Sequence, residues 1–279
     1  MENLFIYKVF NLYFSPMNKK SYCSVLIMIW VYMSSFCHCD GQNVWSHGAI
    51  IRGDVTVKKI TLVFTGHEHA EGADEILKFL KEYDLNAAFF LTGDFLRNPD
   101  FEPIIHRMIE DGHYLGPHSD KHLLYCSWDD REKLLVDKAT FFQDLGNNYQ
   151  ELERFGIQLD QAVYFMPPYE WYNSTISEWS LEFGSQLVNF TPGTRSNADY
   201  TEPGMPNYIG SVEILESIWA YEEKHTDGLN GFILLSHMGV GKNRTDKFYK
   251  QLPHLIDGLQ GKGYEIVALE ELLNAKRNH

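Results

Sequence analysis

The chain has 279 residues, of which 44% are hydrophobic and 22% charged, and its formal net charge at pH 7 is −14. This length and composition allow one large or two small soluble domains with ample core. The negative charge argues against nucleic acid or an anionic membrane surface as a partner, because both need a basic patch.

Residues 17–40 have the pattern of a secretory signal. A basic start, Met17–Lys20 (MNKK), precedes an apolar run of about fifteen residues and then small residues. The run is too short to favour a permanent membrane span. Met17 is therefore interpreted as the natural start, with residues 1–16 as upstream translation or a genuine extension. We expect residues 1–40 to be absent from a secreted or cell-envelope protein whose folded domain is residues 41–279.

The cysteines agree with this interpretation. Of the four, Cys23, Cys37 and Cys39 lie in or beside the signal, and only Cys126 lies in the body. Cys126 can form no internal disulfide, so the core must hold the fold. A lipid anchor at Cys37 or Cys39 is the one membrane attachment considered, although the residues before each match a lipoprotein box poorly.

The body of the chain alternates between strand and helix patterns. Residues 42–54 (QNVWSHGAIIRGD) are interpreted as a loop and a short lead-in, and a long loop covers Thr191–Gly210. Elsewhere, β-branched apolar runs ending at Gly or Pro alternate with segments whose apolar residues recur at helical spacing. The predicted strands are Lys58–Gly66, Leu85–Gly93, His113–His118, Gln161–Pro168, Ser185–Phe190, Gly231–Gly239 and Tyr264–Ala268. The predicted helices are Ala73–Asp84, Asp100–Gly112, Asp130–Phe155, Ser174–Phe183, Ser211–Lys224 and Lys247–Gly261, followed by a short terminal helix.

This alternation predicts a single α/β domain with a parallel sheet, either closed into a barrel or open and doubly wound. In both architectures the functional site lies at the carboxyl ends of the strands. We therefore expect His67, His118 and His237, which follow three different strands, to converge. The polar residues at predicted strand ends are His67, Glu68, Asp94, His118, Tyr169, Glu170, Asn189 and His237.

The segment GPHSDKH (residues 116–122) contains two histidines four residues apart, His118 and His122. Both imidazoles can point at one ion if the segment forms a turn of helical pitch, and His67 is the best-placed third ligand. An all-imidazole set suits zinc, cobalt or nickel better than magnesium or calcium. The alternative is that His118 caps a strand end and His122 is a surface residue.

Two further segments carry candidate chemistry. His237, in ILLSHMG, is either a satisfied histidine at the barrel rim or a general acid that protonates a leaving amine. The loop FMPPYEWYN (residues 165–173) presents Tyr169, Trp171 and Tyr172, which form either a sugar platform or ordinary loop packing. The backbone N–H of Tyr169 is a candidate oxyanion donor.

With these segments in place, residues Ile60 to Leu273 resemble the polysaccharide deacetylases of the NodB-homology type, carbohydrate esterase family 4. HSDKH matches the family's His-Ser/Thr-x-x-His metal motif, although Leu123 stands where Pro is usual. MPPYEWYN resembles the Arg-x-Pro-Tyr/Phe-Gly motif, and ILLSHMG places His237 in the position of the catalytic acid. The resemblance implies a distorted (β/α)7–8 barrel, a divalent metal that is usually zinc, and removal of an N-acetyl, sometimes an O-acetyl, group from a poly- or oligosaccharide.

The chain departs from the family in its first motif, Thr-Phe-Asp-Asp-Gly. The corresponding segment is VFTGHEHAEG, and the Asp pair falls on Thr65–Gly66 or on Gly66–His67. The second alignment is preferred, and it makes His67 the third ligand. The Arg that pairs with the missing base is also absent, with Met166 in its place, so no buried charge is left without a partner.

The resemblance implies that the metal polarises the acetyl carbonyl and that a carboxylate takes a proton from water. Glu68 is ranked first as that base, ahead of Glu71, Asp94 and Glu170. Asp199 and Arg195 are candidates to orient His237. The expected substrate contacts are Tyr169, Glu170, Trp171, Tyr172 and Asp94.

Two other functions remain open. One is a non-catalytic carbohydrate-binding protein of the same fold, which the absent Asp pair favours and the retained histidines oppose. The other is a hydrolase of a small amide or imide, which the secretory signal opposes.

Overall fold

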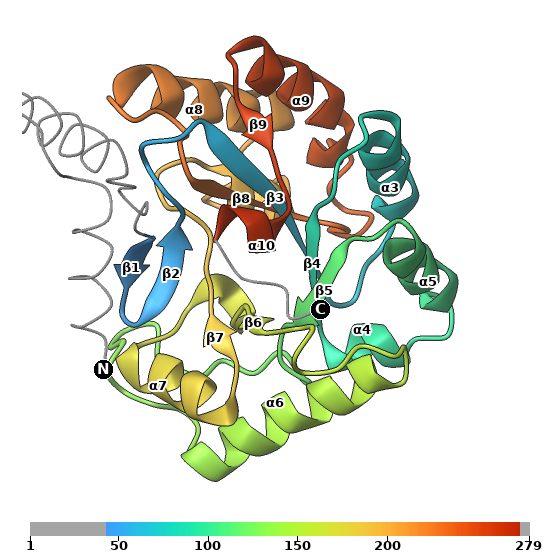
Figure 1. Cartoon of the computed structure of the whole chain (residues 1–279), viewed down its shortest axis with the longest axis vertical. Helices are drawn as coiled ribbons and strands as arrows, with labels where there is room; N and C mark the ends of the chain where they lie inside the picture. The colour runs from blue at the N-terminus through green and yellow to red at the C-terminus, as the bar shows by residue number, and fades with distance from the viewer. Residues whose placement is uncertain (1–42, 274–279) are drawn as a thin grey trace, which may run out of the picture. The chain divides into compact units, whose positions relative to one another are not determined.

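A central parallel sheet carries the strand ends at which the polar residues lie. The structure is a computed structural model that describes residues 43–273 (Figure 1), so the signal segment, Met17, Cys37 and Cys39 lie outside the described residues. The sheet order is β5-β4-β3-β8, with β9 also paired to β3. Its strands are β3 (Lys59–Gly66), β4 (Ala88–Leu91), β5 (Tyr114–Pro117), β8 (Phe232–His237) and β9 (Glu265–Ile266).

Shorter strands continue the sheet around into a distorted barrel. β6 (Tyr164–Phe165) and β7 (Gln186–Leu187) form a parallel pair, and β1 (Val44–Ser46) and β2 (Ala49–Arg52) form an antiparallel hairpin. Backbone N–H groups link these pieces: Met166 donates to Pro117 at 3.2 Å, Asn189 to Ile50 at 2.8 Å and Thr191 to Ile233 at 3.0 Å. The predicted α/β barrel is therefore confirmed.

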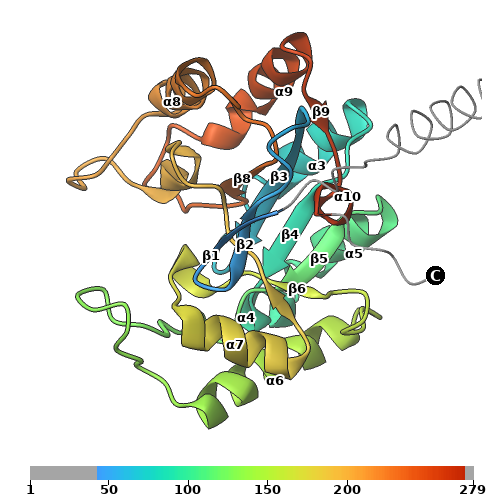
Figure 2. The ribbon, with the colours of Figure 1, turned by 60° about the vertical axis from the view of Figure 1, so that its left-hand side comes forward.

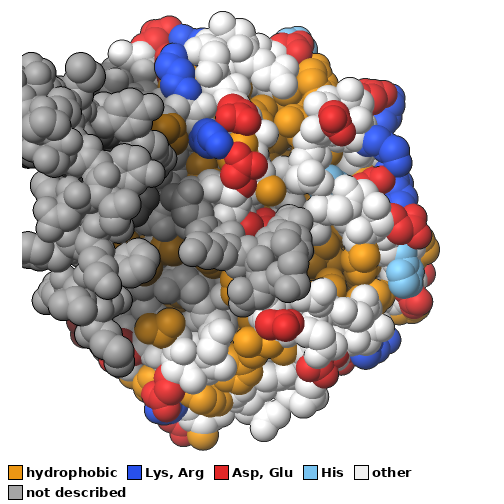
Figure 3. All heavy atoms as spheres, in the orientation of Figure 1, with side chains coloured by type: hydrophobic (Ala, Val, Ile, Leu, Met, Phe, Trp, Pro, Cys, Tyr) orange, Lys and Arg blue, Asp and Glu red, His pale blue; other side chains and the backbone are white. Residues whose placement is uncertain are grey.

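Helices surround the strands on the outside (Figure 1). Figure 2 shows α6 and α7 together at one end of the view and α8 and α9 at the other. On the face shown in Figure 3, basic and acidic side chains are interspersed. No helix within residues 43–273 is long and apolar enough to span a bilayer. The helices are α3 (Ala73–Glu82), α4 (Gly93–Arg97), α5 (Glu102–Glu110), α6 (Lys138–Glu153), α7 (Ser174–Phe183), α8 (Ser211–Lys224), α9 (Leu252–Gly261) and α10 (Leu269–Leu272).

Strand alternation divides the core into two clusters. On β3, Leu62 and Phe64 belong to the larger cluster between sheet and helices, whereas Val63 belongs to the smaller cluster inside the barrel. Because successive side chains of a strand point to opposite faces, Thr65 faces the barrel interior like Val63. A Cβ on Gly66 would lie 2.6 Å from the Met238 side chain, on the other face.

Helix α4 was not predicted, and the predicted strands Gln161–Pro168 and Ser185–Phe190 are reduced to the two-residue strands β6 and β7. Two further predictions were wrong. The helix predicted from Asp130 begins only at Lys138, because the Asp130 carboxylate accepts the Glu132 N–H in a turn and Asp137 caps the helix by accepting the Thr140 N–H at 2.8 Å. The lead-in at residues 42–54 contains the β1–β2 hairpin instead of a loop. The two strands are adjacent in the sequence, but each is too short to show a clear alternation of apolar and polar residues.

Candidate active site

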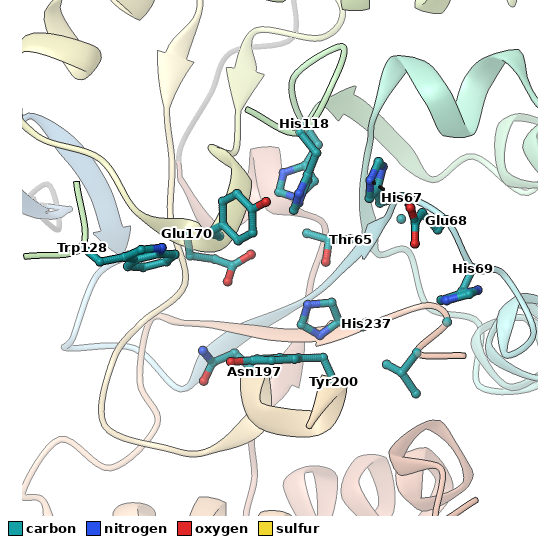
Figure 4. A pocket seen from close by; sticks show the side chains of 15 residues that line it. Thr65, His67, Glu68, His69, His118, Trp128, Glu170, Asn197, Tyr200 and His237 are labelled. Carbon is teal, nitrogen blue, oxygen red and sulfur yellow. Dashed lines mark ion pairs between the residues drawn. The ribbon is translucent and has the colours of Figure 1, made fainter. Parts of the chain in front are cut away.

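A cavity of about 490 Å³ opens at the carboxyl ends of β3, β5 and β8 (Figure 4). His118, Glu170 and His237 point toward its centre, where Thr65 also lies. The Thr65 hydroxyl is buried, and the described residues offer it no hydrogen-bond partner. The cavity is lined by Thr65, Gly66, His67, Glu68, His69, His118, His122, Trp128, Tyr169, Glu170, Asn197, Tyr200, His237, Gly239 and Val240.

His118 is fixed in position and tautomer. Its backbone N–H donates to the Asn148 side chain at 2.8 Å and to the Leu91 carbonyl at 3.1 Å. Its Nδ1 lies 2.8 Å from the Met166 carbonyl. Since a carbonyl only accepts, Nδ1 carries the proton and Nε2 keeps its lone pair. Burial lowers the pKa of His118 to about 3, so the ring is neutral.

A tight turn returns His122 to the same cavity. Ser119 and His122 both adopt left-handed backbone conformations, with φ of 73° and 54°. The His118 and His122 ring centroids lie 5.1 Å apart with the planes inclined by 61°. Burial, reinforced by His118, lowers the pKa of His122 to about 2. The segment therefore supplies two neutral imidazoles at the strand end.

The third predicted ligand, His67, enters the cavity in a different orientation. Its ring stacks on His122, with centroids 4.5 Å apart and planes within 11° of parallel, and its Nδ1 lies 3.1 Å from the Thr92 hydroxyl. In-plane lone pairs of two stacked rings cannot meet at one ion. Accordingly, no three His, Cys, Asp or Glu side chains within residues 43–273 are arranged to hold a metal. The predicted set of three histidines does not fit one ion in this arrangement, whereas the inclined pair His118 and His122 provides suitable neutral donors.

His237 is held by a carboxylate from a distant loop. The Asp199 carboxylate accepts the His237 backbone N–H at 2.8 Å and lies 2.6 Å from its Nδ1. Burial lowers the pKa of His237, but Asp199, only 3% exposed, more than offsets this and the pKa is raised. Asp199 lies on the 3₁₀ turn Ser196–Tyr200. This pair leaves Nε2 of a readily protonated imidazole available for proton transfer.

Glu170 supplies a carboxylate beside His237. It follows two prolines in the 3₁₀ turn Pro168–Glu170, and both Tyr169 and Glu170 have positive φ, 59° and 52°. Each such conformation costs about 1–3 kcal/mol in a non-glycine residue and is typical of functional sites. Burial raises the pKa of Glu170 to about 7, with His237 opposing the rise and Asp199 adding to it. A carboxylate of this pKa can accept a proton near neutral pH.

The other candidate bases have different surroundings. The Glu68 side chain is 73% exposed at the cavity mouth, 4.0 Å from His67 Nε2. Glu71 accepts hydrogen bonds from Lys247 and from the Val240 N–H. Asp94 is paired with Arg97 and Lys121 and does not line the cavity.

The aromatic residues of the predicted platform separate into two groups. Tyr169 lines the cavity. Tyr172 is buried, and its hydroxyl donates to the Ser46 carbonyl at 3.1 Å. Trp171 donates from Nε1 to the Ser127 carbonyl at 3.1 Å. Trp171 and Tyr172 thus support the loop rather than line the cavity.

Several cavity residues were not predicted from the sequence, and the largest of them are Trp128 and Tyr200. Trp128 lies between the predicted strand His113–His118 and the predicted helix Asp130–Phe155, in a segment for which no element and no role were predicted. Tyr200 directly follows Asp199, one of the two residues considered for orienting His237, and this adjacency was the available signal. The other, Arg195, bonds to the Asn207 carbonyl and does not line the cavity.

A fully buried arginine anchors the loop that carries Asp199. Arg244 donates to the carbonyls of Thr201 at 2.7 Å, Ile209 at 3.0 Å and Asp246 at 2.6 Å. These contacts join both ends of the segment 201–209 to the loop after β8. The loop following Asp199 is therefore fixed by one side chain.

Replacing Arg244 by methionine is expected to lower the free energy of unfolding by about 2–4 kcal/mol, because buried carbonyls lose their donors. Urea unfolding followed by tryptophan fluorescence measures the loss. Arg154→Met, at an exposed site paired with Glu151, is the matched control and should change stability by less than about 0.5 kcal/mol. Equal stabilities of the two variants would contradict the anchoring role.

Comparison with known proteins agrees with this architecture. A family model described as polysaccharide deacetylase matches residues 52–188. An uncharacterized 30.6 kDa protein of Geobacillus stearothermophilus is 29% identical over 250 residues, which cover 85% of this chain and 81% of that protein. The peptidoglycan-N-acetylglucosamine deacetylase PgdA of Listeria monocytogenes is 26% identical over 226 residues, 79% of this chain but only 40% of PgdA.

Among solved structures, the fold is similar to that of BA3943, a CE4 family pseudoenzyme from Bacillus anthracis. The TM-score is 0.64 at 19% identity, over 84% of this chain and 71% of that chain. A BA3943 mutant of the same fold has restored enzymatic activity. The fold thus occurs in active and inactive proteins, and the function depends on the residues of the cavity.

Proposed function

The chain belongs to the polysaccharide deacetylase family, and from this premise we propose that it is a hydrolase that removes N-acetyl groups from a poly- or oligosaccharide. The observation that carries the proposal is the arrangement of Glu170 beside the Asp199–His237 pair in the cavity. A binding site alone needs neither a carboxylate with a pKa of about 7 nor an oriented imidazole.

In the proposed reaction, Glu170 accepts a proton from a water molecule whose oxygen attacks the acetyl carbonyl carbon. The Tyr169 N–H, from the turn that carries Glu170, stabilises the resulting oxyanion. His237 then gives its Nε2 proton to the sugar nitrogen as the C–N bond breaks. The products are acetic acid, which passes its proton to the released amine or to solvent, and the sugar amine, and the proton on Glu170 restores the protonated His237.

Glu170 is preferred to Glu68 as the base for two reasons. Glu170 lies inside the cavity with His237, whereas the Glu68 side chain is 73% exposed at its mouth. Burial raises the pKa of Glu170 to about 7, which suits a group that accepts a proton near neutral pH. This assignment replaces the missing Asp of the first motif with a carboxylate from another loop.

Incubation with N-acetylated and O-acetylated oligosaccharides tests the proposal. We expect equal amounts of acetate and free amine from the N-acetylated oligomer. Release of acetate only from an O-acetylated xylan would show that the protein cleaves an ester bond instead of an amide bond. Release from a small acetamide alone would favour the amidase alternative.

Zinc is the ion proposed for this site, with His118 and His122 as its protein ligands. His118 and His122 would hold the ion, since both rings are neutral and lie 5.1 Å apart with planes inclined by 61°. When bound there, the ion would supply positive charge to polarise an acetyl carbonyl.

Elemental mass spectrometry of the purified protein measures this binding. We expect zinc, or cobalt or nickel when supplied, in the wild type and in His67→Ala, and its loss in both His118→Ala and His122→Ala. Two protein ligands predict weak binding that a chelator removes readily. Loss of the ion in His67→Ala as well would restore the three-histidine site and contradict the present orientation of His67.

Export is part of the proposal, because residues 17–40 carry the signal pattern. Amino-terminal sequencing of the exported protein should find a start near residue 41. A lipid-modified amino terminus at Cys37 or Cys39 would instead indicate a cell-envelope anchor.

A second function, carbohydrate binding without turnover, is favoured by the residues at the first motif. Thr65 stands at the cavity centre and Gly66 faces the core, so neither position supplies a carboxylate. Sugar binding without acetate release from any acetylated glycan would support this alternative.

A further inference from the structure

Besides Tyr169, which precedes Glu170, two exposed aromatic side chains from other loops line the cavity. Trp128 is 57% exposed and follows the His122 turn, and Tyr200 is 45% exposed and follows Asp199. Figure 4 shows Trp128 beyond Glu170 and Tyr200 below His237, with Asn197 next to Tyr200. Aromatic rings gathered around one cavity, unlike single exposed rings elsewhere on a surface, are typical of ligand-binding sites.

Trp128 is held rigidly from beneath. Its ring lies 5.5 Å from that of Trp171 and 5.7 Å from that of Tyr169, against which it packs edge to face. The Arg131 guanidinium covers Trp171 at 3.8 Å, and Trp171 bonds to the Ser127 carbonyl beside Trp128. A ring fixed in advance loses little conformational entropy when a ligand covers it.

Tyr200 is also placed by the site itself. Its ring packs edge to face against His237, with centroids 5.5 Å apart, and Arg244 anchors the loop that follows. The exposed ring therefore stands directly beside the proposed acid. Trp128 is in turn connected to the proposed base, because its neighbour Tyr169 precedes Glu170.

Sugar rings match this combination of groups. A pyranose has an apolar C–H face that packs on an aromatic ring and a hydroxyl edge that bonds to groups such as Asn197. When one acetylated unit lies at Glu170 and His237, Trp128 and Tyr200 remain free to contact the neighbouring units. We propose that Trp128 and Tyr200 bind the sugar units that flank the acetylated one, so that the protein selects glycan chains over single sugars. This inference rests on the proposed function for the position of the acetylated unit.

Titration calorimetry with N-acetylglucosamine and its β-1,4-linked oligomers of two to five units tests the proposal. The Glu170→Gln background preserves the acetyl groups and leaves both aromatic residues intact. We expect binding to strengthen with chain length, and Trp128→Ala to weaken pentamer binding about 5–10-fold while leaving the monomer unchanged. Tyr200→Ala should have a similar effect on the pentamer.

Trp45→Ala is the matched control, since Trp45 is 54% exposed on β1 and does not line the cavity. Its pentamer affinity should equal that of the parent, and thermal unfolding should show all variants folded. Trp128→Phe, which keeps an aromatic face, should recover part of the loss.

Two results would overturn the inference: affinity independent of chain length, or Trp128→Ala and Trp45→Ala binding the pentamer equally. The readout is separate from turnover. Length-dependent binding lost in Trp128→Ala, without acetate release by the wild type, would retain the inference and reject the deacetylase function. Acetate release with the same kcat/KM from monomer and pentamer would retain the function and reject the inference.

Discussion

Replacing Glu170 by glutamine is expected to lower kcat/KM for acetate release by about 10²–10⁴-fold at pH 8, because the amide cannot accept a proton. In the wild type, kcat/KM should rise with pH through about 7 as Glu170 loses its proton. Steady-state assays between pH 5 and 9 measure both effects. Glu68→Gln, at the exposed mouth of the cavity, is the control and should keep most of the activity.

The same substitution gives a second readout that does not depend on substrate. The folded-state pKa of Glu170, about 7, exceeds the unfolded value of about 4.3, so the folded protein binds an additional proton between these pH values. Its contribution to stability is therefore present below about pH 4 and is lost as pH rises to about 7. Glu170→Gln should unfold at a higher temperature than the wild type at pH 8, and the difference should shrink at pH 4.

An activity loss in Glu68→Gln with full activity in Glu170→Gln would reverse the assignment of the base. A thermal unfolding difference that does not change with pH would show that Glu170 titrates normally. Loss of activity together with increased stability at pH 8 is the combination expected of a strained, buried catalytic group.

Removing His237 is expected to have an effect of similar size. His237→Ala should lower kcat for N-acetylated oligomers by about 10²–10⁴-fold, because the amine must then leave without a proton donor. His106→Ala, at an exposed position on α5 away from the cavity, should not change kcat. An O-acetylated substrate with a better leaving group should be affected less by His237→Ala.

Asp199→Asn tests how Asp199 acts on His237, independently of the proton transfer by His237 itself. The Asp199 carboxylate raises the pKa of His237, so its removal should lower that pKa and move the alkaline limb of the kcat profile to lower pH. Unchanged pH dependence in Asp199→Asn, or near-wild-type kcat in His237→Ala, would reject the acid role.

The fold was predictable because long, buried strands and amphipathic helices carry strong local patterns. β3 is buried along nearly its whole length, and α3 places Ile76, Leu77 and Leu80 on one buried face. The segment before α6 was not predictable in this way, because the turn at Asp130 depends on individual side-chain hydrogen bonds. The β1–β2 hairpin was missed because its strands have only three and four residues.

His67, His118 and His237 line one cavity, as predicted from their positions at the carboxyl ends of parallel strands. The orientation of the His67 ring could not be predicted from the sequence. His67 reaches the cavity but stacks on His122. Asp199 lies in a long loop without a period, so its pairing with His237 depends on tertiary contacts such as those of Arg244. Packing also decides that Trp128 is the exposed ring and that Trp171 lies beneath Arg131.

The rearranged first motif has a physical explanation in the barrel interior. Met166, in the place of the family's Arg, is fully buried among apolar side chains, and Thr65 is uncharged. Neutral groups thus stand where the family resemblance implies a charged pair, while Glu170 places a carboxylate in the cavity from the strained turn after β6. This combination is consistent with a reorganised active site.

Acetate release and sugar binding, measured in the same samples, decide whether this cavity is a deacetylase active site. Wild type, Glu170→Gln and His237→Ala are each incubated with the N-acetylated pentamer, and acetate is followed by proton NMR while binding is followed by calorimetry. All three proteins should bind the pentamer, and only the wild type should release acetate at an appreciable rate. Pentamer binding by all three without acetate from the wild type, with or without added zinc, would contradict it and identify a carbohydrate-binding protein.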